Sequence, residues 1–386
     1  MAGAAPFLPY GRQMIDADDA AAVLATLRSD WLTTGPLVDA FEKAWAEYCG
    51  AGDAVVFSNG TAALHAAVAA LGLSAGDMVI VTPMTFVASV NCVLYAGATP
   101  VFADVDPGTL LMDPDEVARL ARQHGDRIKA IIPVDYAGLP CDYDAIRAAA
   151  PGVPIIADAC HSPGALDKGR KTGALADLTC FSFHPVKHLT TGEGGAVTTD
   201  DPELAARLRR FRNHGIDTDH RSRAAAGAWF YDMKELGFNY RLTDMQCALG
   251  LSQLRKLPAW VDRRRELARL YHEELAGLTG VAPLTGRPGA ESSWHLFVAR
   301  IGRDFGMSRD DVFTELRNRR IGANVHYRPV YLHSYYRDRL GFAPGLCPVA
   351  EAAGEEIISL PFWAGMEDAD VGRVVSALAD LGGSAS

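Results

Sequence analysis

Short apolar segments alternate with amphipathic ones over the first half of this chain, and this alternation restricts the fold more than any other feature. Seven segments are nearly continuous in apolar character: residues 54–58, 78–82, 99–103, 128–134, 154–157, 178–182 and 195–199. Strands that are covered on both faces have this composition. Helical patterns lie between several of them, such as residues 64–71, which end at Gly72. The order of strand, helix and strand predicts an α/β fold whose mainly parallel sheet lies between layers of helices.

The second half of the chain has a different pattern. After Asp200 the sequence predicts long amphipathic helices, which cover residues 243–257 and, after a break at Pro258, continue to about residue 275. The remainder predicts a smaller α+β unit with a strand at 293–301, a helix at 308–320, a strand through Val325 and a final helix at 368–381. We therefore expect two domains, a large one over residues 1–257 and a small one over residues 258–386.

The overall charge and the cysteines narrow the expected partners and compartment. With 386 residues, a formal net charge of −10 and a pI near 5.6, the chain lacks the basic field that attracts nucleic acids and anionic membranes, so neither is an expected partner. The longest uncharged run, residues 78–103, is interrupted by prolines and a glycine, which disfavours a membrane span. The seven cysteines form no C-x-x-C pair and indicate a reducing compartment, the cytoplasm. No histidine or cysteine spacing fits a zinc site, so no metal is predicted.

One lysine is distinguished by its surroundings. Lys187 lies between the apolar segment 178–182 and the glycine-rich turn Thr190-Thr-Gly-Glu-Gly-Gly195. A poorly solvated amine has a lowered pKa, and the neutral amine is the nucleophile that forms a Schiff base with an aldehyde. An ordinary lysine at the edge of a loop explains this context equally well.

Three further features lie where parallel sheets bind ligands, just beyond the predicted strands. Asp158 ends the strand at 154–157; in a pyridoxal-phosphate enzyme such a carboxylate pairs with the pyridinium nitrogen, although a capping aspartate is an equal alternative. The turn Ser58-Asn-Gly60-Thr61-Ala62 leads into a helix N-terminus, where free amides and the helix dipole favour phosphate, but such turns are common. Phe86, one turn into the next helix, can stack on a planar ring but is more simply a core residue.

Several motifs in a fixed order resemble the DegT/DnrJ family of sugar aminotransferases, within the aspartate-aminotransferase fold class. Together they span nearly the whole chain and are more specific than any one of them alone. The motifs are Tyr10-Gly-Arg-Gln13, Trp31-Leu-Thr-Thr-Gly-Pro36, Asn59-Gly-Thr-Ala-Ala-Leu64, Thr85-Phe-Val-Ala-Ser89, Asp158-Ala-Cys-His161, Phe181-Ser-Phe-His-Pro-Val-Lys187 and Phe238-Asn-Tyr-Arg-Leu-Thr-Asp244. The resemblance implies the type I fold of pyridoxal-phosphate-dependent transferases, with pyridoxal 5′-phosphate as cofactor.

The resemblance also implies how the cofactor is held. Lys187 would bind it covalently, Asp158 would pair with its ring nitrogen, and His161 would lie against the ring or its phenolic oxygen. The turn at Gly60 would receive the phosphate, which the amides of Thr61 and Ala62 and the side chain of Ser182 would hold.

Other implied roles concern the partner subunit and the substrate. Phe86 would stack on the ring, and Asn239 would reach the phosphate bound by the neighbouring subunit, so a homodimer with shared sites is the expected catalytic unit. Thr33, Glu193 and His326 would border the sugar or its diphosphate. Without the resemblance, these three are better explained as a turn threonine, a loop acid and a strand histidine.

Within the family, the lysine segment and the turn after it are most similar to UDP-4-amino-4,6-dideoxy-N-acetyl-β-L-altrosamine transaminases of pseudaminic acid synthesis. Asn324-Val-His-Tyr-Arg-Pro-Val330 and Ile358-Ser-Leu-Pro-Phe362 indicate the same subgroup. The implied reaction moves an amino group from L-glutamate to a nucleotide-linked keto sugar, UDP-4-keto-6-deoxy-N-acetyl-β-L-altrosamine. The chain departs from the family pattern at Cys160, where alanine is usual, and at Asp135-Tyr-Ala-Gly-Leu139, where a histidine and then a glutamine are expected.

Alternatives stay open at this stage. The sugar can be linked to dTDP or GDP and aminated at C3 or C4, and the same fold supports pyridoxal-phosphate dehydratases and racemases. Retention of Lys187 argues against the dehydratase branch that replaces this lysine by histidine. A regulatory protein that binds the cofactor or a nucleotide sugar without catalysis is a further alternative. The arginine-rich stretches 207–212, 263–265 and 317–320 predict solvated, ion-paired helix faces.

Overall fold

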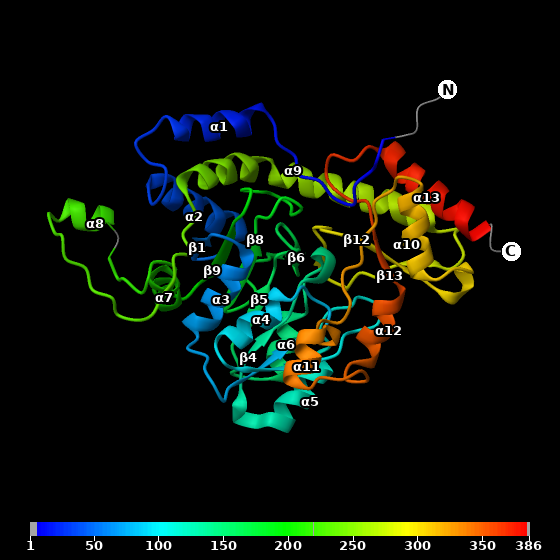
Figure 1. Cartoon of the computed structure of the whole chain (residues 1–386), viewed down its shortest axis with the longest axis horizontal. Coiled ribbons are helices and arrows are strands. Elements are labelled where there is room, and N and C mark those ends of the chain that lie inside the picture. Colours follow the sequence, from blue (N-terminus) through cyan, green and yellow to red (C-terminus); the bar gives the residue numbers. More distant parts are fainter. Residues whose placement is uncertain (1–5, 219, 384–386) are drawn as a thin grey trace.

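The computed structural model describes residues 6–218 and 220–383, and at its centre (Figure 1) a four-stranded and a three-stranded sheet are joined by isolated bridges into one layer of seven strands. The strand order is β3-β2-β4-β5-β8-β9-β1, in which the bridges of Ile131 with Ile155 and Val134 with Asp158 join β4 to β5. Only β9 runs antiparallel to its neighbours. The strands are β1 (Asp53–Phe57), β2 (Met78–Val81), β3 (Thr99–Phe102), β4 (Ile128–Ile132), β5 (Ile156–Asp158), β8 (Leu178–Ser182) and β9 (Gly195–Thr199). All seven predicted strands are present, and the mainly parallel α/β sheet is confirmed.

Helices cover both faces of this sheet, as successive residues of β1 demonstrate. Val55 and Phe57 join one hydrophobic core with α3, whereas Val56 joins another with Trp45 of α2 and residues of α9. Because side chains of a strand alternate between its faces, a strand buried on both faces needs a continuous apolar run. The helices of this part are α2 (Pro36–Cys49), α3 (Gly60–Ala70), α4 (Ala88–Tyr95), α5 (Pro114–His124), α6 (Tyr143–Ala149) and α7 (Pro202–Arg212).

The long helix α9 (Asp244–Leu275) has no interruption, so the predicted break at Pro258 is wrong. Proline removes one backbone donor, but Leu257 and Val261 on either side of it are buried, and their packing holds the helix together. Residues 247–261 of α9 pack in the core with α2, and residues 267–275 pack in the core of the C-terminal part. The division into residues 1–257 and 258–386 stays a proposal, with its boundary inside this helix.

The C-terminal part contains an antiparallel sheet of β10 (Val281–Pro283), β12 (Phe297–Ile301) and β13 (Ile357–Leu360). Its helices are α10 (Arg309–Asn318), α11 (Ser334–Leu340), α12 (Pro348–Glu356) and α13 (Asp368–Gly383). The predicted strand through Val325 is wrong, since Asn324 forms only an isolated bridge with Ser359. The chain turns there to line a cavity, and Pro329 offers no donor for a ladder. The place beside β12 is taken by β13, a strand that we did not predict.

Two helices lie outside these layers (Figure 1). Helix α1 (Ala17–Leu27) lies along α9, where Lys256 pairs with the carboxylates of Asp16 and Asp19. Helix α8 (His220–Ala225) and the residues after it project from the body, and Trp229 and Leu236 there are 86% and 77% exposed. A separate short sheet consists of β6 (Leu166–Asp167), β7 (Arg170–Lys171) and β11 (Ala290–Glu291). Within residues 6–218 and 220–383, no helix combines the length and the apolar character needed to cross a bilayer.

Candidate functional site

Strands β1, β5 and β8 end at one edge of the sheet, and a cavity of about 1010 Å³ lies there. This edge is where parallel sheets bind ligands. Most of the predicted site residues line the cavity: Gly60, Thr61, Ala62, Phe86, Asp158, His161, Ser182, Lys187, Glu193 and His326. Thr33 and Asn239 do not. The sheet therefore brings together residues that are far apart in sequence.

Lys187 follows β8 in a turn, and its partly buried side chain lines the cavity. Its Nζ atom lies 3.5 Å from Nε2 of His295. Burial lowers the pKa of Lys187, because it removes water from the ammonium form, and the neighbouring Cys160 and Asp158 partly oppose this effect. A lowered pKa enlarges the neutral, nucleophilic fraction of the amine, as its sequence context predicts.

The carboxylate of Asp158 is held from two sides at the wall of the cavity. Its Oδ1 accepts the amide of Cys160 at 3.1 Å, and its Oδ2 accepts the hydroxyl of Ser89 at 2.5 Å. The Ser89 hydroxyl lies 2.7 Å from Oγ1 of Thr85. Turns, and not a helix, follow β5, so Asp158 is not a helix cap. An acid that is 5% exposed and borders a cavity can pair with a protonated ring nitrogen.

His161 lies among other aromatic rings of the site. Its ring centroid is 4.3 Å from that of His295, and its Nε2 is 3.2 Å from the hydroxyl of Tyr327. Its Nδ1 is buried and pairs with none of the described residues. Burial holds the pKa of His161 well below its ordinary value, so the ring is neutral near pH 7. A neutral ring with a free polar atom fits the expected contact with the cofactor ring or its phenolic oxygen.

The turn from β1 into α3 offers donors to an anion. The amides of Gly60 and Thr61 find no acceptor in the part of the chain that is described, whereas the amide of Ala62 donates to the capping side chain of Asn59 at 2.8 Å. A Cβ atom on Gly60 would lie 3.3 Å from the hydroxyl of Ser182, so this hydroxyl sits against the turn. Two free amides, a helix N-terminus and a hydroxyl fit a phosphate. The expected contribution of Ala62 requires its amide to leave Asn59.

Phe86 does not belong to a helix, so its predicted place one turn into α4 is wrong. It precedes α4, lines the cavity and is 58% exposed. Its ring centroid lies 6.4 Å from that of Tyr327. This exposure rules out the simpler explanation as a core residue and leaves an aromatic face available to a planar ring.

The four remaining predicted residues, three for the substrate and Asn239 for the cofactor phosphate of the neighbouring subunit, fall into two groups. Glu193 and His326 line the cavity. His326 lies outside any strand, its Nδ1 is 2.8 Å from the hydroxyl of Ser359, and burial lowers its pKa to about 3. Thr33 and Asn239 are exposed and form isolated bridges elsewhere. The roles assigned to all four stay predictions.

The two departures from the family pattern differ in their position. Asp135 is buried away from the cavity, where it accepts the amide of Cys141 at 2.9 Å and the hydroxyls of Tyr143 and Ser162 at 2.7 and 2.6 Å. Burial raises the pKa of Asp135 to about 6. Cys160 lines the cavity, and burial beside Asp158 raises the pKa of its thiol well above the ordinary value. Only Cys160 can therefore touch a ligand.

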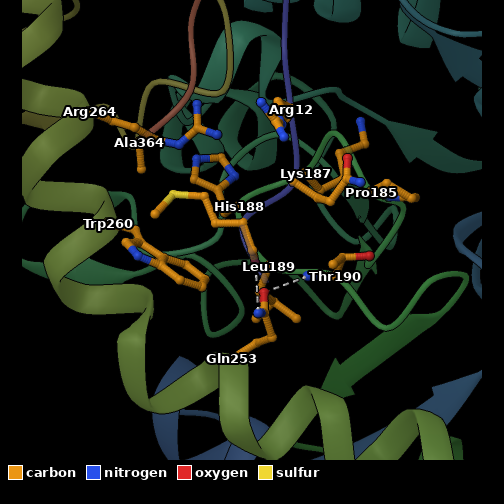
Figure 2. Close-up of a pocket in the computed structure, with 12 residues that line it drawn as sticks. Arg12, Pro185, Lys187, His188, Leu189, Thr190, Gln253, Trp260, Arg264 and Ala364 are labelled. Atoms are coloured by element: carbon orange, nitrogen blue, oxygen red, sulfur yellow. Dashed lines mark hydrogen bonds between the residues drawn. The ribbon is translucent and has the colours of Figure 1, made fainter. Parts of the chain in front are cut away.

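A second, water-sized cavity of about 10 Å³ also borders Lys187 (Figure 2). Figure 2 shows Gln253, Trp260 and Arg264 on helix α9, facing the loop of residues 185–190. Arg264 is 3% exposed and pairs with no carboxylate in the described residues, so the expectation of a solvated, ion-paired face is wrong for it. Its Nη1 donates to the carbonyls of Trp294 and His295 at 3.0 and 3.3 Å. Burial lowers the pKa of Arg264 to about 10.

Three residues at the site were not predicted. Ser89 and Tyr327 lie inside motifs quoted above, and Ser89 is four residues from Thr85, the spacing of one helical face. His295 stands in Ser293-Trp-His-Leu296, which carries no signal of its own. In residues 6–218 and 220–383, no group of three or more histidine, cysteine, aspartate or glutamate residues is arranged to hold a metal ion.

Comparison with known proteins agrees with this geometry. The DegT/DnrJ/EryC1/StrS aminotransferase family matches residues 13–379. The spore coat polysaccharide biosynthesis protein SpsC of Bacillus subtilis is 38% identical over 380 residues, 97% of each chain. The sugar aminotransferase Spr1654 of Streptococcus pneumoniae, in its PMP form, superposes with a TM-score of 0.91 at 31% identity, covering 98% of this chain and 100% of that one. Helicobacter pylori PseC, described as an aminotransferase in pseudaminic acid biosynthesis, has a TM-score of 0.89 at 31% identity and the same coverage.

The family match, the sheet and the cavity residues support one identification. The free amides of α3, the unpaired Nδ1 of His161 and the buried carboxylate of Asp158 suit the phosphate and ring of the predicted cofactor. The chain belongs to the DegT/DnrJ/EryC1/StrS aminotransferase family and is a nucleotide-sugar aminotransferase of fold type I that depends on pyridoxal 5′-phosphate, as its sequence predicts.

Proposed function

We propose that this enzyme transfers an amino group from L-glutamate to UDP-4-keto-6-deoxy-N-acetyl-β-L-altrosamine in pseudaminic acid biosynthesis, with Lys187 as the residue that binds the cofactor and moves the proton. One observation carries the catalytic part of this proposal. The amine of Lys187, the carboxylate of Asp158 and the N-terminus of α3 border a single cavity. A reactive amine, an acid and an anion site are the groups that the cofactor requires.

Lys187 acts as the general acid and base in both half-reactions. Its free amine takes a proton from the carbon that bears the amino group of glutamate and delivers it to C4′ of the cofactor. With the sugar, the same amine moves a proton in the opposite direction. When bound, the cofactor supplies an electron sink for the carbon that loses its proton. The lowered pKa of Lys187 suits this task, because only a neutral amine can accept a proton.

The remaining cofactor residues orient the reacting atoms. Asp158, fixed by the hydroxyl of Ser89, pairs with the ring nitrogen and keeps it protonated. Phe86 stacks on the ring, and His161 lies against the ring or its phenolic oxygen. The free amides of α3 and the Ser182 hydroxyl hold the phosphate, with the Ala62 amide joining them once it leaves Asn59.

We propose a homodimer in which each cavity is shared between two subunits. Asn239 reaches the phosphate bound by the other subunit. The exposed Trp229 and Leu236 near α8 favour such an association, since exposed large apolar side chains mark interaction surfaces. The seven cysteines are free, which supports the proposal of a reducing cytoplasmic compartment.

Glu193, His326 and Thr33 are proposed to border the nucleotide sugar. The specific sugar is supported by the lysine segment, by Asn324–Val330 and by the similarity to PseC. A sugar linked to dTDP or GDP, or one aminated at C3, is the alternative that a substrate assay decides.

The visible absorption of the purified enzyme with its cofactor tests the proposal. Glutamate should bleach the visible band of the lysine-bound cofactor, and the proposed UDP-keto sugar should restore it. Bleaching without restoration would retain glutamate as donor and remove this sugar. A band that does not respond to glutamate would overturn the proposed donor.

A further inference from the structure

His295 lies between the two residues to which the cofactor chemistry has been assigned. Its Nε2 is 3.5 Å from Nζ of Lys187, and its ring centroid is 4.3 Å from that of His161. It lines the same cavity, although it belongs to the loop before β12 in the C-terminal part. No role was predicted for His295 from the sequence.

The backbone fixes this imidazole in place. The amide of His295 donates to the carbonyl of Ala137 at 2.9 Å, and its carbonyl accepts Nη1 of Arg264 at 3.3 Å. A Cβ atom on Gly138 would lie 2.7 Å from the nitrogen of His295 and 2.9 Å from the carbonyl oxygen of His161. This close approach explains why residue 138 is glycine, which also has a φ of +100° there. Loop 136–138 therefore holds the backbones of His161 and His295 in place at the wall of the cavity.

The hydrogen-bond partners select one tautomer of His295. Its Nδ1 is buried and pairs with no group in the described residues. A proton on Nδ1 would leave a buried N–H group without an acceptor, which proteins rarely tolerate. The favoured tautomer carries its proton on Nε2, the atom that faces Lys187. An Nε2–H group can bond to Nζ only through the lone pair of the neutral amine.

We propose that His295 is a positioning residue for Lys187: its Nε2–H donates to the lone pair of Nζ and holds the amine unprotonated and aimed into the cavity. This inference rests on the proposed role of Lys187. The opposite tautomer would accept a proton from an ammonium group and stabilise the charged lysine instead.

Other groups that face Lys187 set the background for this interaction. Asp158, at the end of β5, favours the ammonium form. His161, His188 and His326 lie near enough to interact electrostatically with the amine, and burial holds the pKa of each below its ordinary value, so they are neutral near pH 7. In the cofactor-free enzyme, the Nε2–H donor of His295 and the carboxylate of Asp158 therefore have opposite effects on Lys187. The donor favours the neutral amine, and the carboxylate favours the ammonium form.

Trace acetylation of the cofactor-free full-length enzyme with acetic anhydride measures the neutral fraction of this amine. The extent of modification of Lys187 is read by peptide mass spectrometry and normalised to Lys43, whose side chain is 79% exposed. His295→Asn and His295→Ser remove the donor from reach, and at pH 7.5 each should slow acetylation of Lys187 about threefold to tenfold, the effect of one hydrogen bond on an amine pKa. His295→Gln places an amide donor at a similar reach and should stay near the wild-type rate.

His188→Asn is the matched control, because it makes the same change at a buried histidine next to Lys187 whose Nε2 faces the carbonyl of Ser293. It should leave the rate of Lys187 nearly unchanged. Faster or unchanged acetylation in His295→Asn, or an equal loss in His188→Asn, overturns the proposal. If His295→Asn does not fold, as judged by circular dichroism, the serine variant decides. Failure of the proposed function would appear differently, as a visible lysine-bound cofactor band that persists in Lys187→Ala.

Discussion

Gly60→Ala should weaken cofactor binding about tenfold to 150-fold while the enzyme still folds. An added Cβ atom would lie 2.9 Å from Cβ of Ser182, closer than real Cβ contacts, so Ser182 must move. Such overpacking costs about 1–3 kcal/mol, and the higher helix propensity of alanine returns up to about 1 kcal/mol. The displaced hydroxyl loses its hydrogen bond to the phosphate, and a bond to a charged group contributes about 1.5–3 kcal/mol, which gives the predicted range.

Titration of the cofactor-free enzyme with pyridoxal 5′-phosphate, followed by absorbance, measures this affinity. Gly372→Ala in α13 is the control, because no atom lies within 4 Å of its added Cβ. It should bind the cofactor as the wild type does and gain up to about 1 kcal/mol in the free energy of unfolding. A folded Gly60→Ala enzyme with wild-type affinity would refute the assignment of the phosphate to the turn at α3 and Ser182.

Three further substitutions test the catalytic residue, a buried ion pair and a neutral histidine. Lys187→Ala should abolish multiple turnovers, measured as amino sugar formed, with an unchanged circular dichroism spectrum; detectable repeated turnover would remove its catalytic role. The mostly buried Arg212 contacts Glu42 at 2.5 Å, and Glu42→Ala removes this partner. The substitution should lower the free energy of unfolding, measured in urea, by about 3 kcal/mol. A loss below about 1 kcal/mol would contradict the buried pair. The pKa of His326 is about 3 in the folded protein and about 6.5 in the unfolded chain. Between these pH values unfolding takes up a proton, so the free energy of unfolding falls as the pH drops from about 6.5 toward 3. His326→Asn should reduce this slope, seen in urea unfolding at several pH values, by up to about 1.4 kcal/mol per pH unit, and an identical slope would show that His326 is not buried in its neutral form.

The features predicted from sequence are those that depend on local pattern. Strands buried on both faces must be apolar throughout, so all seven strands of the central sheet were recognisable. Parallel strands end at one edge, and this rule alone placed Asp158 and Lys187 near a common site. The turn at Gly60 was recognisable because it joins a strand to a helix start.

The features missed depend on contacts between distant segments. Helix α9 continues through Pro258 because residues of the helix on both sides of this proline are buried in two hydrophobic cores. The helix propensities of the neighbouring residues do not contain this information. The sequence predicts Arg264 at the surface, because only the folded chain brings the carbonyls of Trp294 and His295 to its side chain. The role proposed for His295 depends on loop 136–138, more than 150 residues away in sequence, so no spacing could have predicted it.

The charge of the cavity connects the proposed cofactor site with the proposed dimer. Among the described residues that line it, Arg328 is the arginine and Lys187, whose amine is proposed to be held neutral, is the lysine, while burial holds His161, His295 and His326 neutral near pH 7. A nucleotide diphosphate and the cofactor phosphate together bring several negative charges, and a buried anion needs donors or cations. The α3 amides supply donors for one phosphate only. A second subunit that adds a donor to this cavity, as proposed for Asn239 at the cofactor phosphate, would therefore help to complete the anion site, which makes association part of cofactor binding and not only of stability.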